Sequence, residues 1–409
     1  MDRMKIGRFT YRFVLPAVIM VSLCSCIEPF EATFVDFESA LVVEATITNE
    51  FKNQEVYLTR TFEFEADGPM PESNANVKIE DGSGNSFSFQ DTGNGIYVSS
   101  EPFAAQSDNS YRLFITTADG RTYSSETATL KNAVSIDELK VERRQNDFGE
   151  DGIAILLDTN DPQGQSKYYR YTFEETFRIE APFWSPNSLG ADTRPEAVVC
   201  GVQVLQQTRD ISESICYTTV PSNDIVIAST DSFEQDRLDD FMVRFINRDN
   251  YIISHRYSIL VKQFVLSNEA YTFYETLQEF SGSESLFSET QPGFLVGNVA
   301  SEINQAEKVL GYFDVSPVTE QRIFFNYEDF YPNEDLPPYI EPCTFTAPVL
   351  SRGLPPICVL LRLVELDLVA YVEENTNGDS NQGPFLVVPK VCGDCTSIGS
   401  STPPEFWVE

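Results

Sequence analysis

Short alternations of apolar and polar residues, separated by turn residues, fill the chain between residues 40 and 130. Residues 77–80 (VKIE) alternate in this way and run into the turn cluster 81–85 (DGSGN), and Asp119-Gly120 is a favoured hairpin turn. Short strands at such regular spacing are typical of a β-sandwich. We therefore predict that residues 40–130 form an N-terminal sandwich of immunoglobulin or transthyretin type, in a chain that is mainly β.

The strand pattern resumes after a linker at residues 130–150, for example at residues 153–157 (IAILL) and 257–264 (YSILVKQF). We predict a larger β-rich second domain at residues 150–395 and a turn-rich C-terminal tail at residues 396–409. The pattern leaves two arrangements open for the second domain. It is either an independent sandwich or one sheet packed by a helix.

One amphipathic helix is predicted at residues 267–280, inside the second domain. Ser267 can cap its first turn and Gly282 can end it. The residues of its apolar face follow helical spacing: Ala270, Phe273, Tyr274, Leu277 and Phe280. We expect this face to pack against the core, because helices normally bury such a stripe. Residues 311–315 and 322–325 are expected to be closing strands of the same domain.

The first 25 residues have the organisation of a bacterial signal peptide. Basic residues precede an apolar run at residues 13–23, which is too short to span a bilayer. The run ends in LCSC, which resembles a lipobox with Cys26 as the lipid acceptor, whereas Cys24 would have the bulky Leu23 before it. We predict removal of residues 1–25, acylation of Cys26 and a tether at residues 26–39. The alternative is an ordinary secretory signal with incidental cysteines.

The chain is strongly acidic. It has 63 Asp and Glu against 28 Lys and Arg, a formal net charge of −35 at pH 7. Such a charge repels the phosphates of nucleic acids, which bind to basic patches, so we expect no nucleic-acid partner. No second apolar run approaches the length of a membrane span, so the lipid on Cys26 is the only membrane attachment that the sequence offers.

Six cysteines follow the predicted tether: Cys200, Cys216, Cys343, Cys358, Cys392 and Cys395. An even number in an exported chain indicates disulfides. Cys200 and Cys216, 16 residues apart across a polar segment, are the preferred pair. The other four either pair within the sequence neighbours 343–358 and 392–395, or crosswise. A zinc site and a redox CxxC motif are disfavoured by the cysteine spacing and by the lack of a surrounding βαβ pattern.

The sequence offers little for catalysis. His255 is the only histidine and has no partner motif, so it is expected to be a surface or partly packed strand residue. The adjacent carboxylates are attributed to chance in so acidic a chain: Glu174/Glu175, Asp239/Asp240 and Glu373/Glu374. We therefore expect no enzymatic activity and no cofactor, and a carboxylate-based hydrolase is the least favoured function.

Two loops are weaker candidates for binding. Residues 375–381 (NTNGDSN) space oxygen-bearing side chains as a calcium loop does, but depart from the EF-hand pattern, so no metal is predicted and calcium stays an open alternative. Phe183 and Trp184 lie between two prolines, where they could stack on a ligand. The more common role for such a pair is to cover the edge of a core.

Several stretches together resemble an uncharacterised lipoprotein family of Bacteroidetes-type bacteria, catalogued as domain of unknown function forty-two forty-nine. In chain order they are residues 26–31 (CIEPFE) with 41–47 (LVVEATI), 77–82 (VKIEDG) with 95–97, 111–113 and 119–120, 161–162 before 168–170, and 292–298 (PGFLVGN) leading to 309–313 (VLGYF). No single stretch is specific. Their order along nearly the full length carries the resemblance.

The resemblance implies an outer-membrane lipoprotein of the kind often encoded beside TonB-dependent receptors, with no established ligand or catalytic residues. We therefore expect a non-enzymatic accessory lipoprotein that captures ligand for a TonB-dependent importer or caps it. The alternative is a surface adhesion or structural module of the envelope. Glu28 and Glu31 faintly resemble the acidic signals for surface display, but Ile27 and Pro29 interrupt that pattern, so the membrane face stays open.

Overall fold

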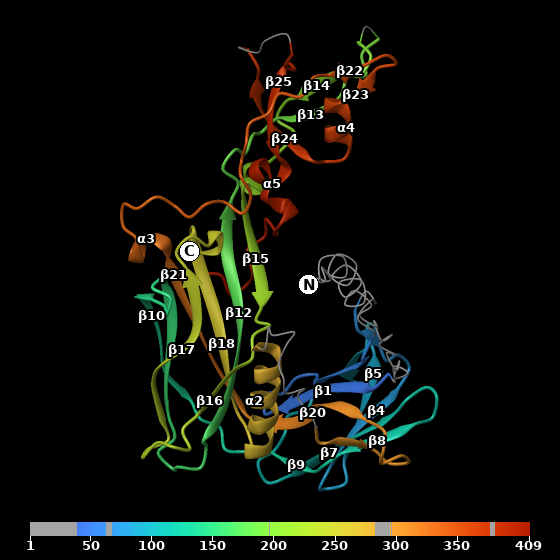
Figure 1. Cartoon of the computed structure of the whole chain (residues 1–409), viewed down its shortest axis with the longest axis vertical. Coiled ribbons are helices and arrows are strands. Elements are labelled where there is room, and N and C mark those ends of the chain that lie inside the picture. The colour runs from blue at the N-terminus through green and yellow to red at the C-terminus, as the bar shows by residue number, and fades with distance from the viewer. Residues whose placement is uncertain (1–38, 63–67, 196, 283–294, 296, 377–380) are drawn as a thin grey trace, which may run out of the picture.

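The computed structural model describes residues 39–62, 68–195, 197–282, 295, 297–376 and 381–409 (Figure 1). The signal segment, Cys26 and residues 377–380 of the candidate calcium loop lie outside these ranges. The described chain is mainly β, as predicted, and forms three bodies. An N-terminal body and a central body lie side by side, and a smaller distal lobe projects from the end of the central body (Figure 1).

The N-terminal body is built on one sheet, in which eleven strands are described. Its path runs in the order β19-β8-β7-β4-β5-β6-β2-β1-β20, with β3 and β9 paired to β2 and β7. The strands are β1 (Leu41–Thr48), β2 (Glu55–Arg60), β3 (Met70–Pro71), β4 (Asn76–Asp81), β5 (Ser86–Asp91), β6 (Ile96–Ser99), β7 (Ser110–Thr116), β8 (Thr122–Ser125), β9 (Ala128–Thr129), β19 (Val299–Ser301) and β20 (Val309–Ser316).

Alternation of side chains gives this sheet its inner face. Val77 and Ile79 of β4 are buried, while Lys78 between them is partly exposed and pairs with Glu80. Strands with side chains of period two bury one face and solvate the other. The sheet curls around its apolar residues, so that the two layers of the predicted sandwich belong to one continuous, nearly closed sheet.

The last two strands of this sheet come from far along the chain, which corrects one sequence expectation. The strand pattern places residues 311–315 in the second domain, but β20 pairs with β1 in parallel, Leu41 opposite Val309 and Thr48 opposite Ser316. β19, which also comes from this distant segment, pairs with β8 in the antiparallel direction. The strand predicted at residues 311–315 is present, but it completes the sheet of the N-terminal body and not the second domain. A parallel partner reached through more than 200 intervening residues leaves no local signal in the sequence.

Close backbone contact explains two glycines of the 292–298 and 309–313 stretches. Gly311 has φ +98°, and a Cβ there would lie 1.8 Å from the carbonyl oxygen of Val43. A Cβ on Gly297 would lie 1.6 Å from the carbonyl oxygen of Gly311. The side chain of Asn298 takes the place of a neighbouring strand in hydrogen bonding to the Phe313 backbone. Its Oδ1 accepts from Phe313 N and its Nδ2 donates to Phe313 O, both at 2.8 Å. These contacts close the sheet.

The central body is a two-layer sandwich. Its three-stranded sheet contains β10 (Ile136–Gln145), β11 (Asp151–Asn160) and β17 (Arg237–Asn247). Its five-stranded sheet contains β12 (Tyr168–Glu180), β15 (Ile215–Pro221), β16 (Val226–Ser229), β18 (Arg256–Val265) and β21 (Val318–Asn326). Short helices lie at its rim: η1 (Ile211–Ser214), η2 (Tyr251–Ile253) and α3 (Tyr327–Phe330). Of the two arrangements left open by the sequence, this is the independent sandwich.

The predicted amphipathic helix is α2 (Asn268–Gly282), which lies at the seam between the two large bodies (Figure 1). Ser267 caps it as predicted, because its Oγ accepts a hydrogen bond of 3.1 Å from Ala270 N. Ala270 and Phe273 are buried, and the ring of Phe273 lies 5.1 Å from that of Tyr312 on β20. The helix therefore packs its apolar face against the seam and not against one sheet alone.

Two charged residues, the half-buried Arg170 and the buried Asp314, lie near α2 at the seam. The guanidinium of Arg170 on β12 lies between the rings of Phe264 and Tyr274, 4.6 Å from each centroid. Burial raises the pKa of Asp314 on β20, which accepts a hydrogen bond from Ser316, and attraction to Arg170 opposes that shift. A cation of the central body thus faces a buried carboxyl of the N-terminal body across the seam.

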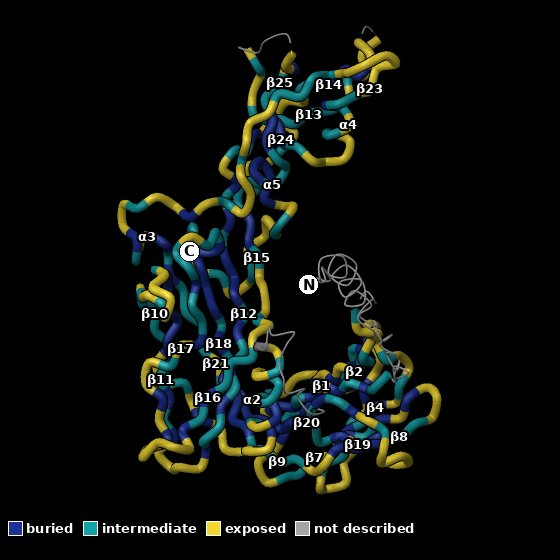
Figure 2. The backbone as a smooth tube through the Cα atoms, in the orientation of Figure 1, coloured by how far each residue is buried: buried dark blue, intermediate teal, exposed yellow. Residues whose placement is uncertain are grey.

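The distal lobe comprises residues 181–210 and 336–397, an insertion between β12 and β15 together with a C-terminal part of the chain. Its elements are β13 (Ser188–Ala191), β14 (Val202–Leu205), β22 (Ser351–Arg352), β23 (Ile357–Cys358), α4 (Leu360–Glu365), β24 (Val369–Glu374), β25 (Phe385–Pro389), α5 (Lys390–Gly393) and η3 (Cys395–Ser397). Figure 2 shows many exposed and intermediate residues in this lobe, whereas most of the buried residues follow the strands of the two large bodies.

The strand contact at Gly311 predicts a large loss of stability for Gly311→Ala. The new methyl group would meet the backbone of β1, so β1 and β20 would have to separate, and we expect the free energy of unfolding to fall by at least about 3 kcal/mol. Gly149→Ala is the matched control, since Gly149 also has a positive φ of 78°, but a Cβ there would have no neighbouring atom within 4 Å. It should lose only about 1–2 kcal/mol. Equal losses in chemical denaturation would contradict the contact.

Candidate functional site

All six of the cysteines that follow the predicted tether are paired, as expected, and one bond, Cys343–Cys392, belongs to the crosswise alternative that the sequence left open. The bonds are Cys200–Cys358, Cys216–Cys395 and Cys343–Cys392. The preferred pair Cys200–Cys216 is wrong, as are the pairs 343–358 and 392–395. The partners are 158, 179 and 49 residues apart in the sequence. Nearness along the chain is a poor guide here, because the lobe is assembled from two distant segments.

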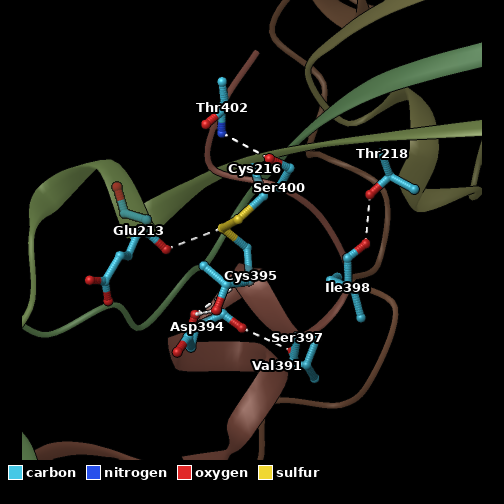
Figure 3. Close-up of a disulfide and its surroundings, with 12 residues drawn as sticks. Glu213, Cys216, Thr218, Val391, Asp394, Cys395, Ser397, Ile398, Ser400 and Thr402 are labelled. Atoms are coloured by element: carbon cyan, nitrogen blue, oxygen red, sulfur yellow. Dashed lines mark hydrogen bonds between the residues drawn. A yellow bond between two sulfur atoms is a disulfide. The ribbon is translucent and has the colours of Figure 1, made fainter. Parts of the chain in front are cut away.

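One of the disulfides attaches the base of the distal lobe to the central body. Cys216 of β15 bonds to Cys395 of η3 at the base of the lobe, as Figure 3 shows. Beside it the hydroxyl of Thr218 donates to Ile398 O at 2.6 Å. Ser400 exchanges backbone hydrogen bonds with Tyr217 in the same stretch. The C-terminal segment is thereby fastened along β15, and the cysteines are committed to sulfur–sulfur bonds and not to zinc.

The C-terminal tail continues onto the central body. The Trp407 ring lies 5.0 Å from the Tyr217 ring and 5.7 Å from the Phe324 ring, both at steep angles. The guanidinium of Arg322 stacks on Phe406 at 3.6 Å. These contacts cover the outer face of the five-stranded sheet. The tail is turn-rich, as expected, and it contacts the sheet through Phe406 and Trp407, although most of its residues are exposed.

His255 is a partly packed residue. Burial lowers its pKa below the usual 6.5, and attraction to Glu180, whose Oε1 lies 3.7 Å from its Nδ1, works in the opposite direction. Its backbone carbonyl accepts a hydrogen bond from Tyr327 N at 3.1 Å. The imidazole has a carboxylate neighbour but forms no hydrogen bond with a nucleophile in the described chain. It does not form a catalytic set with the six cysteines of the described ranges, which are all in disulfides.

Two of the three pairs of adjacent carboxylates, Glu174/Glu175 and Asp239/Asp240, belong to ion pairs. Glu175 accepts hydrogen bonds from Tyr257 Oη at 2.6 Å and from Arg244 Nε at 3.0 Å, and it is buried between the two sheets. Glu174 points the other way and pairs with Lys262 at 3.1 Å. Alternation along a strand sends neighbouring side chains to opposite faces, so these two carboxylates cannot act on one bond. Asp240 pairs with Lys140 and Arg144 at the surface, and Glu373 and Glu374 are exposed at the end of β24.

Phe183 and Trp184 lie at the base of the lobe. Phe183 N donates to Cys392 O at 2.9 Å, and its ring meets that of Phe345 edge-on at 4.7 Å. Trp184 packs against the central core, with Arg209 over its ring at 6.0 Å. Both rings are half-buried, which agrees with a role in covering the core edge.

A cavity of about 720 Å³ opens beside the closure of the N-terminal sheet. Its wall includes Gly297, Asn298 and Val309 of the two glycine-containing stretches, together with Arg112 and Glu126. Arg112 is held in place because its Nε donates to Ser125 O at 2.9 Å and its Nη2 to Ser124 Oγ at 2.7 Å. Pockets of this size, with a few fixed polar groups, are typical of small-ligand sites.

Acidic and basic groups both reach the rim of the cavity. Glu307 accepts hydrogen bonds from Tyr123 Oη at 2.6 Å and from Arg121 Nη1 at 2.9 Å, which together with Ser301 outweigh the effect of burial and lower its pKa. The site can therefore offer both donors and acceptors to a polar molecule. Sequence reasoning missed it. The one available signal is the pair of glycine-containing stretches, which indicate the family and not a site.

No metal centre is seen in the described ranges, where no group of three or more His, Cys, Asp or Glu side chains is arranged to hold an ion. The candidate calcium loop is not decided by this, because residues 377–380 lie outside those ranges. None of the helices in the described part of the chain combines the length and the hydrophobicity needed to traverse a bilayer.

The disulfide pattern predicts the peptides released by proteolysis without reduction. Mass spectrometry of the native protein should find Cys200 joined to Cys358, Cys216 to Cys395 and Cys343 to Cys392. A peptide that joins Cys200 to Cys216 would contradict the structure.

Replacing both Cys216 and Cys395 with Ser should lower the free energy of unfolding by about 3–5 kcal/mol, since this bond closes a long loop.

The titration of His255 can be followed without interference from another histidine, because it is the only histidine in the chain. Its folded pKa lies below the unfolded value near 6.5, so the unfolded chain takes up the proton first and stability falls as the pH drops below 6.5. We expect the imidazole resonances in NMR to titrate below pH 6.5. His255→Gln should remove the part of the stability loss that begins as the pH falls below about 6.5. A midpoint above 6.5 would contradict the burial argument.

The comparisons with known proteins agree with the resemblance read from the sequence. The family described as Domain of unknown function (DUF4249) matches residues 27–322, well over half of the 409 residues. No curated protein matches the chain. The matched range contains the N-terminal body with both glycine-containing stretches and most of the central body, whereas the C-terminal part of the distal lobe lies beyond it. The chain therefore belongs to the DUF4249 family.

Proposed function

We propose that this protein is a non-enzymatic lipoprotein of the outer membrane that works as an accessory partner of a TonB-dependent importer, capturing ligand for it or capping it. The observation that carries the proposal is the acylatable Cys26 at the end of a signal-type segment. A lipid at this position would hold the N-terminal body close to the membrane, through a tether of only residues 26–39. Membership of a family whose members resemble such lipoproteins supports the same function.

Two features of the fold support this proposal. The three disulfides suit an oxidising compartment outside the cytoplasm, where such bonds persist. The cavity beside Asn298 and Arg112 gives the N-terminal body a place to hold a small polar molecule. In the proposed orientation this body is the part nearest the lipid, so a captured molecule would be held near the mouth of a membrane importer.

Affinity purification from detergent-solubilised outer membranes tests the partnership. A tag placed after Glu409 leaves the tether free, and we expect a TonB-dependent receptor in near-stoichiometric amount by mass spectrometry. Cys26→Ser is the informative variant and Cys24→Ser its matched control, since Cys24 is the poorer lipid acceptor. The first should lose both the lipid and most of the receptor, whereas the second should keep both.

Repeated recovery of the lipidated protein without any receptor would contradict the proposal. The adhesion or structural role would then be favoured. A deletion strain would distinguish that role, because it should show impaired attachment or a leaky envelope. Normal attachment and envelope integrity would count against it.

A further inference from the structure

The outer end of the distal lobe exposes a cluster of large apolar side chains, here called the apolar tip: Val198, Val199, Leu354 and Ile357. Leu354 is 99% exposed, and the other three are between 64% and 71% exposed. Single exposed apolar residues are common on soluble proteins, whereas a contiguous group marks a surface that another molecule covers. The tip lies at the far end of the molecule from the N-terminal body, in which the described chain begins (Figure 1).

The apolar tip is held as one unit. The disulfide Cys200–Cys358 joins the turn that carries Val198 and Val199 to the hairpin that carries Leu354 and Ile357. The hairpin is closed by the pairing of Ser351 with Cys358 in β22 and β23. A surface whose two halves are covalently joined loses little conformational entropy when it binds, and this favours affinity.

The segment that contains the hairpin of the apolar tip, residues 342–364, differs in charge from the rest of the chain. Residues 342–364 contain no Asp or Glu and two Arg, although the whole chain has 63 acidic residues. Arg352 is exposed next to Leu354, and no ion pair to it occurs in the described ranges. Arg362 lies 4.0 Å from Glu365 and is also exposed. The hairpin half of the apolar tip is therefore acid-free and weakly cationic, whereas the turn at 198–199 follows Glu196 in the sequence. A surface with such a hairpin complements an apolar recess with acidic groups at its rim.

We propose that the apolar tip is the surface by which this lipoprotein docks onto its importer, in an apolar recess rimmed by acidic side chains on the outer part of that protein. This rests on the proposed function, because it takes the importer as the partner. The convex shape of a hairpin suits insertion into a recess and not the enclosure of a small ligand. The strongly acidic remainder of the chain disfavours an anionic lipid surface as the occupant.

The test uses the full-length lipidated protein in its own membrane. Leu354→Glu combined with Ile357→Glu places two like charges against the acidic rim, and we expect about a tenfold or greater loss of co-purified importer. Phe148→Glu is the matched control, because Phe148 is 90% exposed in the β10–β11 turn of the central body. It should keep the importer at the wild-type level. Unchanged thermal unfolding would show that both variants are folded.

The two proposals fail in different ways. If the wild type recovers the importer and the tip variant recovers it equally, the apolar tip is not the docking surface and the importer partnership stands. If the wild type recovers no importer, the partnership fails and the tip assignment fails with it. A photoreactive residue in place of Leu354 gives an independent readout. An importer adduct that is absent with the same residue at position 148 supports docking, whereas lipid adducts or equal labelling overturn it.

Discussion

The pairing of β20 with β1 is the constraint on which the arrangement of the two large bodies depends. β20 completes the sheet of the N-terminal body, and only Pro317 separates it from β21 in the five-stranded sheet of the central body. Val318 N donates to Asn49 Oδ1 at 2.8 Å, and this hydrogen bond holds the connection between β20 and β21 against the end of β1. A rotation of one body against the other would therefore break the pairing of β20 with β1. The loss of these backbone hydrogen bonds argues for a fixed connection between the two bodies and not a hinge.

The distal lobe is stabilised in a different way. Its apolar clusters are small, with only Val202, Leu360 and Val387 buried in one of them. A segment of this size cannot bury enough surface to offset the entropy of ordering its chain, which is the situation in which disulfides are common. Arg209 adds an ionic link at the base of the lobe, since it pairs with Glu213 at 3.0 Å and with Asp394 at 3.2 Å. The lobe is therefore held by covalent and ionic bonds where the larger bodies rely on packing.

The parts of this fold that could be predicted are those with local causes. The alternation of Val77 and Ile79, the cap at Ser267 and the spacing of Ala270 and Phe273 each act within a few residues, and the structure agrees with all of them. The parts that could not be predicted depend on distant partners. Nothing near Gly311 indicates that Val43 is its neighbour, because the contact is between backbones and leaves only a glycine as its trace.

The candidate site and the apolar tip also differ in how far the sequence alone indicates them. The cavity at Asn298 exists only because two remote strands close one sheet, so it has no motif, whereas the acid-free stretch at residues 342–364 is visible as soon as charge is plotted along the chain. In a protein with a net charge of −35 an acidic surface is the default, since it keeps the chain soluble. A segment that departs from this default and exposes Leu354 weakens that protection. A role for the tip in binding accounts for both departures, and packing within the lobe accounts for neither.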